Sequence, residues 1–100
     1  MKGIIPTQRN PQEGSEMQFI TFFHVLPGNA TKAIKMFKNP KIPPGLRVIE
    51  SYWMFGKPEA LIIFEAPDER SASEFVVQFA TCTEQSTSLV FPVDDLKWTL

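Results

Sequence analysis

Two stretches of this 100-residue sequence are too apolar to be ordinary half-exposed β-strands. Residues 17–26 read MQFITFFHVL and residues 60–66 read ALIIFEA, and both are rich in aromatic and β-branched side chains. Successive side chains of a strand point to opposite faces, so Phe19 and Phe23 would face one way and Phe22 the other. A strand covered on one side only normally alternates apolar with polar residues. The sequence therefore predicts a sheet with two apolar faces, both of which need a cover.

Helical spacing and turn residues place two amphipathic helices and two more strands along the chain. The first helix has Asn29 as its expected N-cap, and the second has Asp68, with Ser71 and Glu74 as a candidate capping box. The remaining segments are a strand over 46–55, a turn over 56–59, a polar loop over 84–88 and a last strand over 89–93, in which Pro92 favours an edge position. The resulting β-α-β-β-α-β order predicts a ferredoxin-like α+β fold, a four-stranded antiparallel sheet with two helices on one face.

A chain of this length fits one domain with one core. We place the domain at residues 17–100. Residues 1–16 hold glycines and prolines among polar residues and are expected to form a flexible N-terminal extension. The alternative is that Ile4 and Ile5 form an arm that packs on a partner.

The second apolar face predicts that the chain pairs with a copy of itself. Two helices can cover only one face of the sheet, and burying a large apolar side chain is worth about 1.5 to 3 kcal/mol. Face-to-face packing of two identical sheets about a two-fold axis would cover the other face. We expect a homodimer and leave assembly beyond the dimer open; pairing of the sheets can leave an inter-sheet space lined by the polar residues of that face.

Composition argues against several classes of function. The formal net charge is -1 and the lysines and arginines are scattered, so nucleic acid is not an expected partner. No signal peptide and no run of membrane-spanning length is present, so no membrane partner is expected. Cys82, the only cysteine, excludes an internal disulfide and fits a cytoplasmic location. Zinc-ligand spacing and glycine-rich phosphate loops are missing, so we expect no metal and no cofactor.

Four segments carry a resemblance to a known family: FITFFHVLPGN, PPGLRVIESYW, SEFVVQFA and LVFPV. Together they span roughly residues 17–96 and resemble a small uncharacterised domain family (domain of unknown function 3303 type) of the dimeric α/β-barrel, ferredoxin-like superfamily. The segments are mostly turn and core residues, so the resemblance implies a fold and implies no assigned activity. In the wider superfamily, cofactor-independent monooxygenases, isomerases and haem-degrading enzymes place a pocket between sheet and helices, which is an analogy of fold only.

His24, the only histidine, is the first candidate for chemistry. Histidine ordinarily titrates near neutrality, which suits a general base or a polar contact for a ligand. Strand parity places His24 on the face of Ile20 and Phe22. The alternative is a hydrogen-bonded histidine in the core or in the dimer interface.

The other candidates lie on the second and third predicted strands. Glu50 and Tyr52 share a face, and Glu65 could approach them across the hairpin. A buried carboxylate must be paired or protonated, which can make an acid or a base, whereas an exposed edge position is the alternative for both glutamates. Tyr52 and Trp53 point to opposite faces, so one should lie in the helix-side core and the other beside a cavity or the dimer side. The candidate catalytic residues are His24 and Glu50, and the candidate ligand-binding residues are Phe22, Tyr52, Trp53 and Glu65; Cys82 is read as a core residue.

Three functions fit these patterns. The first is a homodimeric domain that binds a small, largely apolar molecule in a sheet-helix or inter-sheet cavity, with His24 and Tyr52 as polar contacts. The second is a cofactor-independent monooxygenase or isomerase with His24 as base and Glu50 or Glu65 adjusting its pKa. The third is a structural or regulatory module whose function is dimerisation itself.

Overall fold

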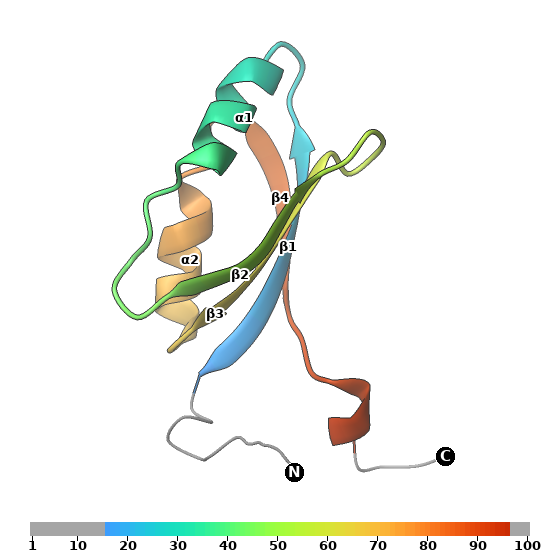
Figure 1. The fold of residues 1–100 in the computed structure, drawn as a ribbon. Coiled ribbons are helices and arrows are strands. Elements are labelled where there is room, and N and C mark those ends of the chain that lie inside the picture. The colour runs from blue at the N-terminus through green and yellow to red at the C-terminus, as the bar shows by residue number, and fades with distance from the viewer. Residues whose placement is uncertain (1–15, 97–100) are drawn as a thin grey trace.

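The structure is a computed structural model that describes residues 16–96. Its elements are β1 (Met17–Val25), α1 (Ala30–Lys38), β2 (Arg47–Trp53), β3 (Ala60–Ala66), α2 (Glu69–Val77), β4 (Thr83–Leu89) and the short 3-10 helix η2 (Val93–Asp95). The strands form one antiparallel sheet in the order β2-β3-β1-β4, and both helices lie on one face of it (Figure 1). This confirms the ferredoxin-like α+β fold. The predicted extension, apart from Glu16, and the residues after Leu96 lie outside the described residues.

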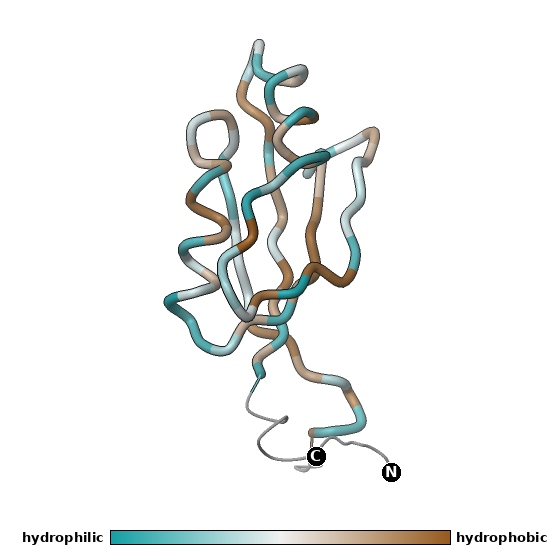
Figure 2. Tube along the Cα trace, turned by 60° about the vertical axis from the view of Figure 1, so that its left-hand side comes forward, coloured by the Kyte–Doolittle hydropathy of each residue, from teal (hydrophilic) through white to brown (hydrophobic). Residues whose placement is uncertain are grey.

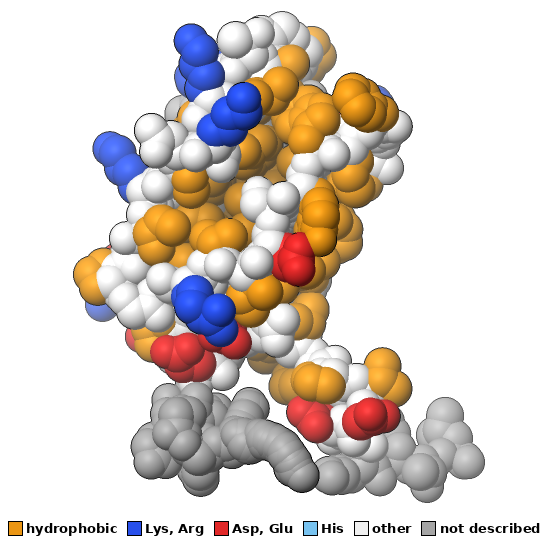
Figure 3. All heavy atoms as spheres, viewed as in Figure 1, with side chains coloured by type: hydrophobic (Ala, Val, Ile, Leu, Met, Phe, Trp, Pro, Cys, Tyr) orange, Lys and Arg blue, Asp and Glu red, His pale blue; other side chains and the backbone are white. Residues whose placement is uncertain are grey.

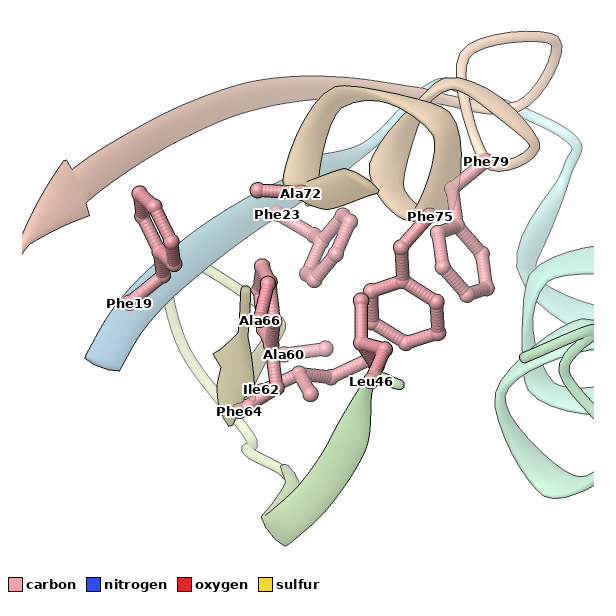
Figure 4. Packing of buried hydrophobic residues seen from close by; sticks show 10 residues of the cluster. All are labelled: Phe19, Phe23, Leu46, Ala60, Ile62, Phe64, Ala66, Ala72, Phe75 and Phe79. Carbon is pink, nitrogen blue, oxygen red and sulfur yellow. The ribbon is translucent and has the colours of Figure 1, made fainter. Parts of the chain in front are cut away.

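The core lies between the helices and the inner face of the sheet. Burial alternates strictly along β3, and five buried phenylalanines, four of them fully buried, form the centre of the cluster (Figure 4). The ring centroids of Phe23 and Phe79 are 5.2 Å apart. Those of Phe64 and Phe75 are 4.9 Å apart. Edge-to-face pairs of this kind add about 0.5 to 1.5 kcal/mol each beyond simple burial. Cys82 is fully buried beside them, as predicted.

The two helices begin in different ways. Asp68 caps α2 as predicted, because its carboxylate accepts the backbone N–H of Ser71 at 2.8 Å. Asn29 occupies the N-cap position of α1, but its side chain donates to the carbonyl oxygen of Pro27 at 3.0 Å and makes no cap. The turn between Pro27 and Asn29 needs Gly28, because its φ of +79° lies in the left-handed region that favours glycine. Asn29 therefore closes this turn instead of capping the helix as predicted.

The strand β2 is shorter than the predicted span of 46–55 and contains an irregularity. Val48 pairs with Phe64 and Glu50 pairs with Ile63, so Ile49 is an extra residue that forms a β-bulge. Beyond the bulge, Tyr52 faces the outer side of the sheet and is half exposed.

The last strand is where the sequence-based prediction was wrong. Residues 84–88 are not a loop, and the strand does not lie at 89–93: β4 spans Thr83–Leu89. Its inward polar side chains find partners, which is why a polar segment can lie on the core side. The Thr83 hydroxyl donates to the carbonyl oxygen of Phe79 at 2.7 Å. The side-chain amide of Gln85 donates to the carbonyl oxygen of Val76 at 2.6 Å. These bonds satisfy groups that burial would otherwise penalise.

In the part of the chain that the structure describes, no helix lies over the outer face of the sheet (Figure 1). Ile20, Leu61 and Ile63 are partly buried on this face, and Phe22 is 39% exposed. Hydrophobic positions continue in the chain that follows β4 toward its C-terminal end (Figure 2), where Phe91 is exposed. Within residues 16–96, no helix is long and apolar enough to cross a membrane.

Candidate functional site

A cavity of about 500 Å³ lies between α1 and the edge strand β2. Its lining comes from the second half of the helix and the end of the strand: Ile34, Phe37, Lys38, Ser51, Tyr52 and Trp53. Figure 3 shows apolar side chains gathered between these two elements, with basic side chains on the side of α1, whose charged residues are all lysines. Cavities that hold small molecules commonly measure about 300 to 1,000 Å³ and are mostly apolar. The α1–β2 cavity has both properties.

Aromatic packing holds the inner wall of the α1–β2 cavity in place. The ring of Phe37 lies 4.9 Å from that of Phe23 and 4.9 Å from that of Phe79, so it is anchored in the core. The ring of Trp53 lies 6.2 Å from that of Phe37. Trp53 is therefore the inward residue of the predicted pair and Tyr52 the outward one. Because β2 is an edge strand, both can still reach the rim of one cavity.

The polar groups at this cavity differ in whether they are free to bond to a ligand. The Tyr52 hydroxyl donates a hydrogen bond to the Glu50 carboxylate. This bond, followed by the negative charge of Glu50, raises the pKa of Tyr52 above its ordinary value. Among residues 16–96, the Lys38 ammonium and the Ser51 hydroxyl have no hydrogen-bond or ion-pair partner from another side chain. A ligand would therefore meet Lys38 and Ser51 as donors and the Tyr52 ring as a surface.

His24 stands apart from this cavity, on the outer face of the sheet. Its Nδ1 lies 3.0 Å from Oε1 of Glu59, and the two side chains are 36% and 21% exposed. An ionised carboxylate only accepts hydrogen bonds, so Nδ1 of His24 donates to Glu59 and Nε2 is the ring nitrogen that this contact does not use. The carboxylate beside His24 is thus Glu59, in place of the predicted Glu50 or Glu65.

Backbone contacts fix Glu59 beside His24. The N–H of Val25 donates to the same carboxylate oxygen at 2.8 Å, and the N–H of Glu59 donates to the carbonyl oxygen of Phe23 at 2.9 Å. The bond from Val25 is the main reason that the pKa of Glu59 lies below its ordinary value, and the bond from His24 contributes further. The pair has the geometry of an oriented base.

The predicted site residues therefore fall in separate places. Tyr52 and Trp53 line the α1–β2 cavity. Phe22 lies on the outer face, on the same rung of the sheet as Tyr52, because both pair with Leu61. Glu65 is bound to Arg47 at 2.9 Å. It lines a different hollow, of about 450 Å³, near the start of β1 and the chain after β4. A catalytic role for His24 and Glu50 stays a prediction, since neither residue lines the α1–β2 cavity.

The sequence analysis missed Lys38, Ser51 and Glu59 as site residues. Lys38 follows Ile34 by one helical turn, a signal that could have placed it beside the apolar stripe. Glu59 was read as a turn residue, and it lies next to His24 only because β1 pairs with β3, with Phe23 opposite Ala60. In the part of the chain that the structure describes, no group of three or more His, Cys, Asp or Glu residues could hold a metal ion.

Comparisons with known proteins agree with this fold. The model of a family described as "Domain of unknown function (DUF3303)" matches residues 17–99. Among solved structures, the crystal structure of MtbAldR superposes with a TM-score of 0.57 at 14% sequence identity, over 75% of this chain and 51% of that one. At this identity the likeness concerns the fold alone, and this chain matches only about half the length of that protein. No curated protein matches the sequence.

Proposed function

The chain belongs to the DUF3303 family of domains of unknown function, and from that premise we propose that it is a binding domain for a small, largely apolar molecule held between α1 and β2. The observation that carries the proposal is the α1–β2 cavity of about 500 Å³. Family membership adds no activity, so the proposal depends on the chain's own side chains. Turnover is not part of it.

The walls of the cavity favour an apolar, flat ligand. Phe37 is held by core rings and Trp53 packs against it, so the surface needs little rearrangement to accept a second ring system. A rigid site avoids part of the entropic cost of ordering side chains on binding, about 0.5 to 1.5 kcal/mol for each flexible one. Tyr52 adds an aromatic surface at the rim.

Binding can be tested with the neutral fluorescent probe N-phenyl-1-naphthylamine. We expect saturable binding at one site per chain, with a rise in probe fluorescence. The variant Ile34→Trp fills the cavity and should weaken binding at least tenfold. Val77→Trp places the same side chain on α2, at a position 62% exposed, and should leave binding unchanged.

Two results would overturn the proposal: wild-type protein without saturable binding, or Ile34→Trp that binds as well as wild type. Circular dichroism would verify that each variant is folded. If Ile34→Trp does not fold, Ser51→Phe narrows the same cavity from the strand side and takes its place. A small molecule that co-purifies and is seen by native mass spectrometry would support the proposal directly.

A second candidate function is pairing with a copy of the chain, favoured by the apolar outer face of the sheet. Four strands of about seven residues present on the order of 500 Å², whereas a stable complex buries about 800 Å² on each partner. The difference can come from the segments that extend on the same side in Figure 1, the β2–β3 hairpin and the chain after β4. Phe55 and Phe91 are exposed there, at 101% and 63%. We therefore propose that the chain functions as a cytoplasmic homodimer.

Light scattering coupled to gel filtration tests the pairing. We expect wild-type protein to be a dimer at micromolar concentration and Phe22→Lys to be a monomer, because it places a charge in the middle of the outer face. Val77→Lys puts the same charge on α2, on the opposite side of the sheet, and should stay dimeric. A monomeric wild-type protein, or a dimeric Phe22→Lys, would contradict the proposal.

A further inference from the structure

We infer that the molecule held between α1 and β2 is an apolar acid, with an aromatic or aliphatic body that ends in an anionic group bound by Lys38. This inference depends on the proposed function, since it names the ligand class of the same cavity. Three features of the described residues carry it: the donors at the rim, the charge of α1, and the position of the nearest carboxylate.

The donors at the rim select a ligand that accepts hydrogen bonds. Lys38 carries three N–H donors and no acceptor, and Ser51 can donate from its hydroxyl. The Tyr52 hydroxyl already donates to Glu50, so the ring but not the hydroxyl remains for the ligand. A carboxylate or a similar anion is the strongest acceptor for an ammonium group.

The helix beside the cavity is entirely basic in its charges. α1 reads ATKAIKMFK, with three lysines and no acidic residue. Lys35 and Lys38 lie in its last turn, where they also stabilise the helix dipole. That effect accounts for lysine at either position, but only Lys38 lines the cavity, four residues after the cavity residue Ile34. Its ammonium is thus the cation that a bound acid would meet.

Among the residues that the structure describes, no carboxylate opposes Lys38 inside the cavity. None of the six lining residues is acidic. The acidic residue next to them along β2 is Glu50, which lies on the outer face and is bound by Tyr52. Within residues 16–96, the ion pairs join other residues: His24 with Glu59, Arg47 with Glu65, and Arg70 with Glu74. An anionic ligand would give Lys38 its counter-charge, and the apolar body would cover Phe37 and Trp53.

A pair of matched probes separates charge from apolar contact. 8-Anilino-1-naphthalenesulfonate and N-phenyl-1-naphthylamine share one ring system and differ in the sulfonate. An exposed ion pair is worth up to about 1 kcal/mol, or roughly fivefold in affinity. We expect the anionic probe to bind wild-type protein about two to five times more tightly than the neutral probe, and this advantage should shrink at high salt.

Substitution of Lys38 tests whether its ammonium group causes the preference for the anionic probe. Lys38→Gln should remove the advantage of the anionic probe and leave the neutral probe within about twofold of wild type, whereas Lys38→Arg should retain it. Lys32→Gln is the control, because it removes the same charge from the same helix at a residue outside the cavity lining. It should change neither probe by more than about twofold.

Each outcome decides one point. Equal affinity of wild type for both probes, or an anionic preference that Lys38→Gln leaves intact, overturns the acid inference and leaves the binding function standing. Equal losses in Lys32→Gln and Lys38→Gln overturn the role of Lys38 and assign the preference to the helix as a whole. Failure of both probes to bind saturably overturns the proposed function, and the inference with it. As a further check, decanoate should displace the anionic probe at lower concentration than decanol does.

Discussion

The face of the sheet beneath the helices and the outer face carry similar apolar side chains in different surroundings. On β3, Ile62 is 2% exposed on the inner face, whereas its neighbour Ile63 is only partly buried on the outer face. Polar side chains differ in the same way: Thr83, on the inner face, is buried and bonded to a backbone carbonyl, and His24, on the outer face, keeps Nε2 free of Glu59. The inner face thus stabilises the fold. On the outer face Phe22 is 39% exposed, and His24 Nε2 has no hydrogen-bond partner among residues 16–96.

The difference between the two faces of the sheet can be tested most directly by one substitution on each face of β3. Ile62→Ala should lower the free energy of unfolding by about 2 to 5 kcal/mol, because it leaves a cavity in a closed core. Ile63→Ala removes the same atoms from a partly exposed site and should cost less than half as much. Urea unfolding at low protein concentration measures both. Equal losses would show that the two faces are equally closed. A loss for Ile63→Ala that grows with protein concentration would show that a second copy covers the outer face.

A smaller loss in the free energy of unfolding is expected when a polar side chain of the inner face is replaced. Thr83→Val removes the hydroxyl that donates to the Phe79 carbonyl oxygen, which keeps a second bond from the N–H of Cys82 at 3.2 Å. We expect the free energy of unfolding to fall by about 0.5 to 1.5 kcal/mol. Thr81→Val is the control, since Thr81 is exposed in the preceding turn. If Thr83→Val were as stable as the wild-type protein, β4 would not depend on this bond.

The smallest effect, on the outer face, should depend on pH. The pKa of Glu59 is lower in the folded chain than its ordinary value of 4.5, mainly because the Val25 N–H donates to its carboxylate. Its contribution to stability is therefore fully present above about pH 4.5, and it is lost as the pH falls through the lower folded pKa. Glu59→Gln should have a lower melting temperature than wild type at pH 7, and the difference should shrink toward pH 3.

Thermal melts at both pH values measure this difference. Asp68, whose pKa is also lowered by its bond with Ser71, is present in both proteins and cancels. A difference that stays constant from pH 7 to pH 3 would contradict the role given to the Glu59 charge.

Local patterns were sufficient to predict much of the inner face. The strand β3 begins and ends where the sequence predicts it, and Asp68 caps α2, because these features depend on neighbouring residues only. The strand β4 was misplaced because its inward residues are polar, and their partners are carbonyl oxygens at the end of α2 that no local pattern reveals. The position of β4 therefore depends on tertiary contacts, which sequence periodicity does not reveal.

The candidate site was harder to predict for the same reason. The opposite orientations of Tyr52 and Trp53 follow from strand parity and are confirmed. The α1–β2 cavity requires the helix to be placed against an edge strand, and the partner of His24 lies 35 residues away, beside β1 only because β1 pairs with β3. The sequence identifies residues with suitable chemistry, but the packing of separate elements determines which of them meet.

The bulge at Ile49 has a consequence for how copies of this chain can add to one another. A regular edge strand exposes a ladder of N–H and C=O groups onto which another chain can add, and repeated addition produces fibres. An extra residue in β2 breaks that ladder and increases its twist. On the opposite edge, β4 carries serine, threonine and glutamate along most of its length, a composition with little tendency to stack into dry sheets. Growth through the edges, which has no natural end, is thereby disfavoured, whereas the proposed face-to-face pairing would end after two copies.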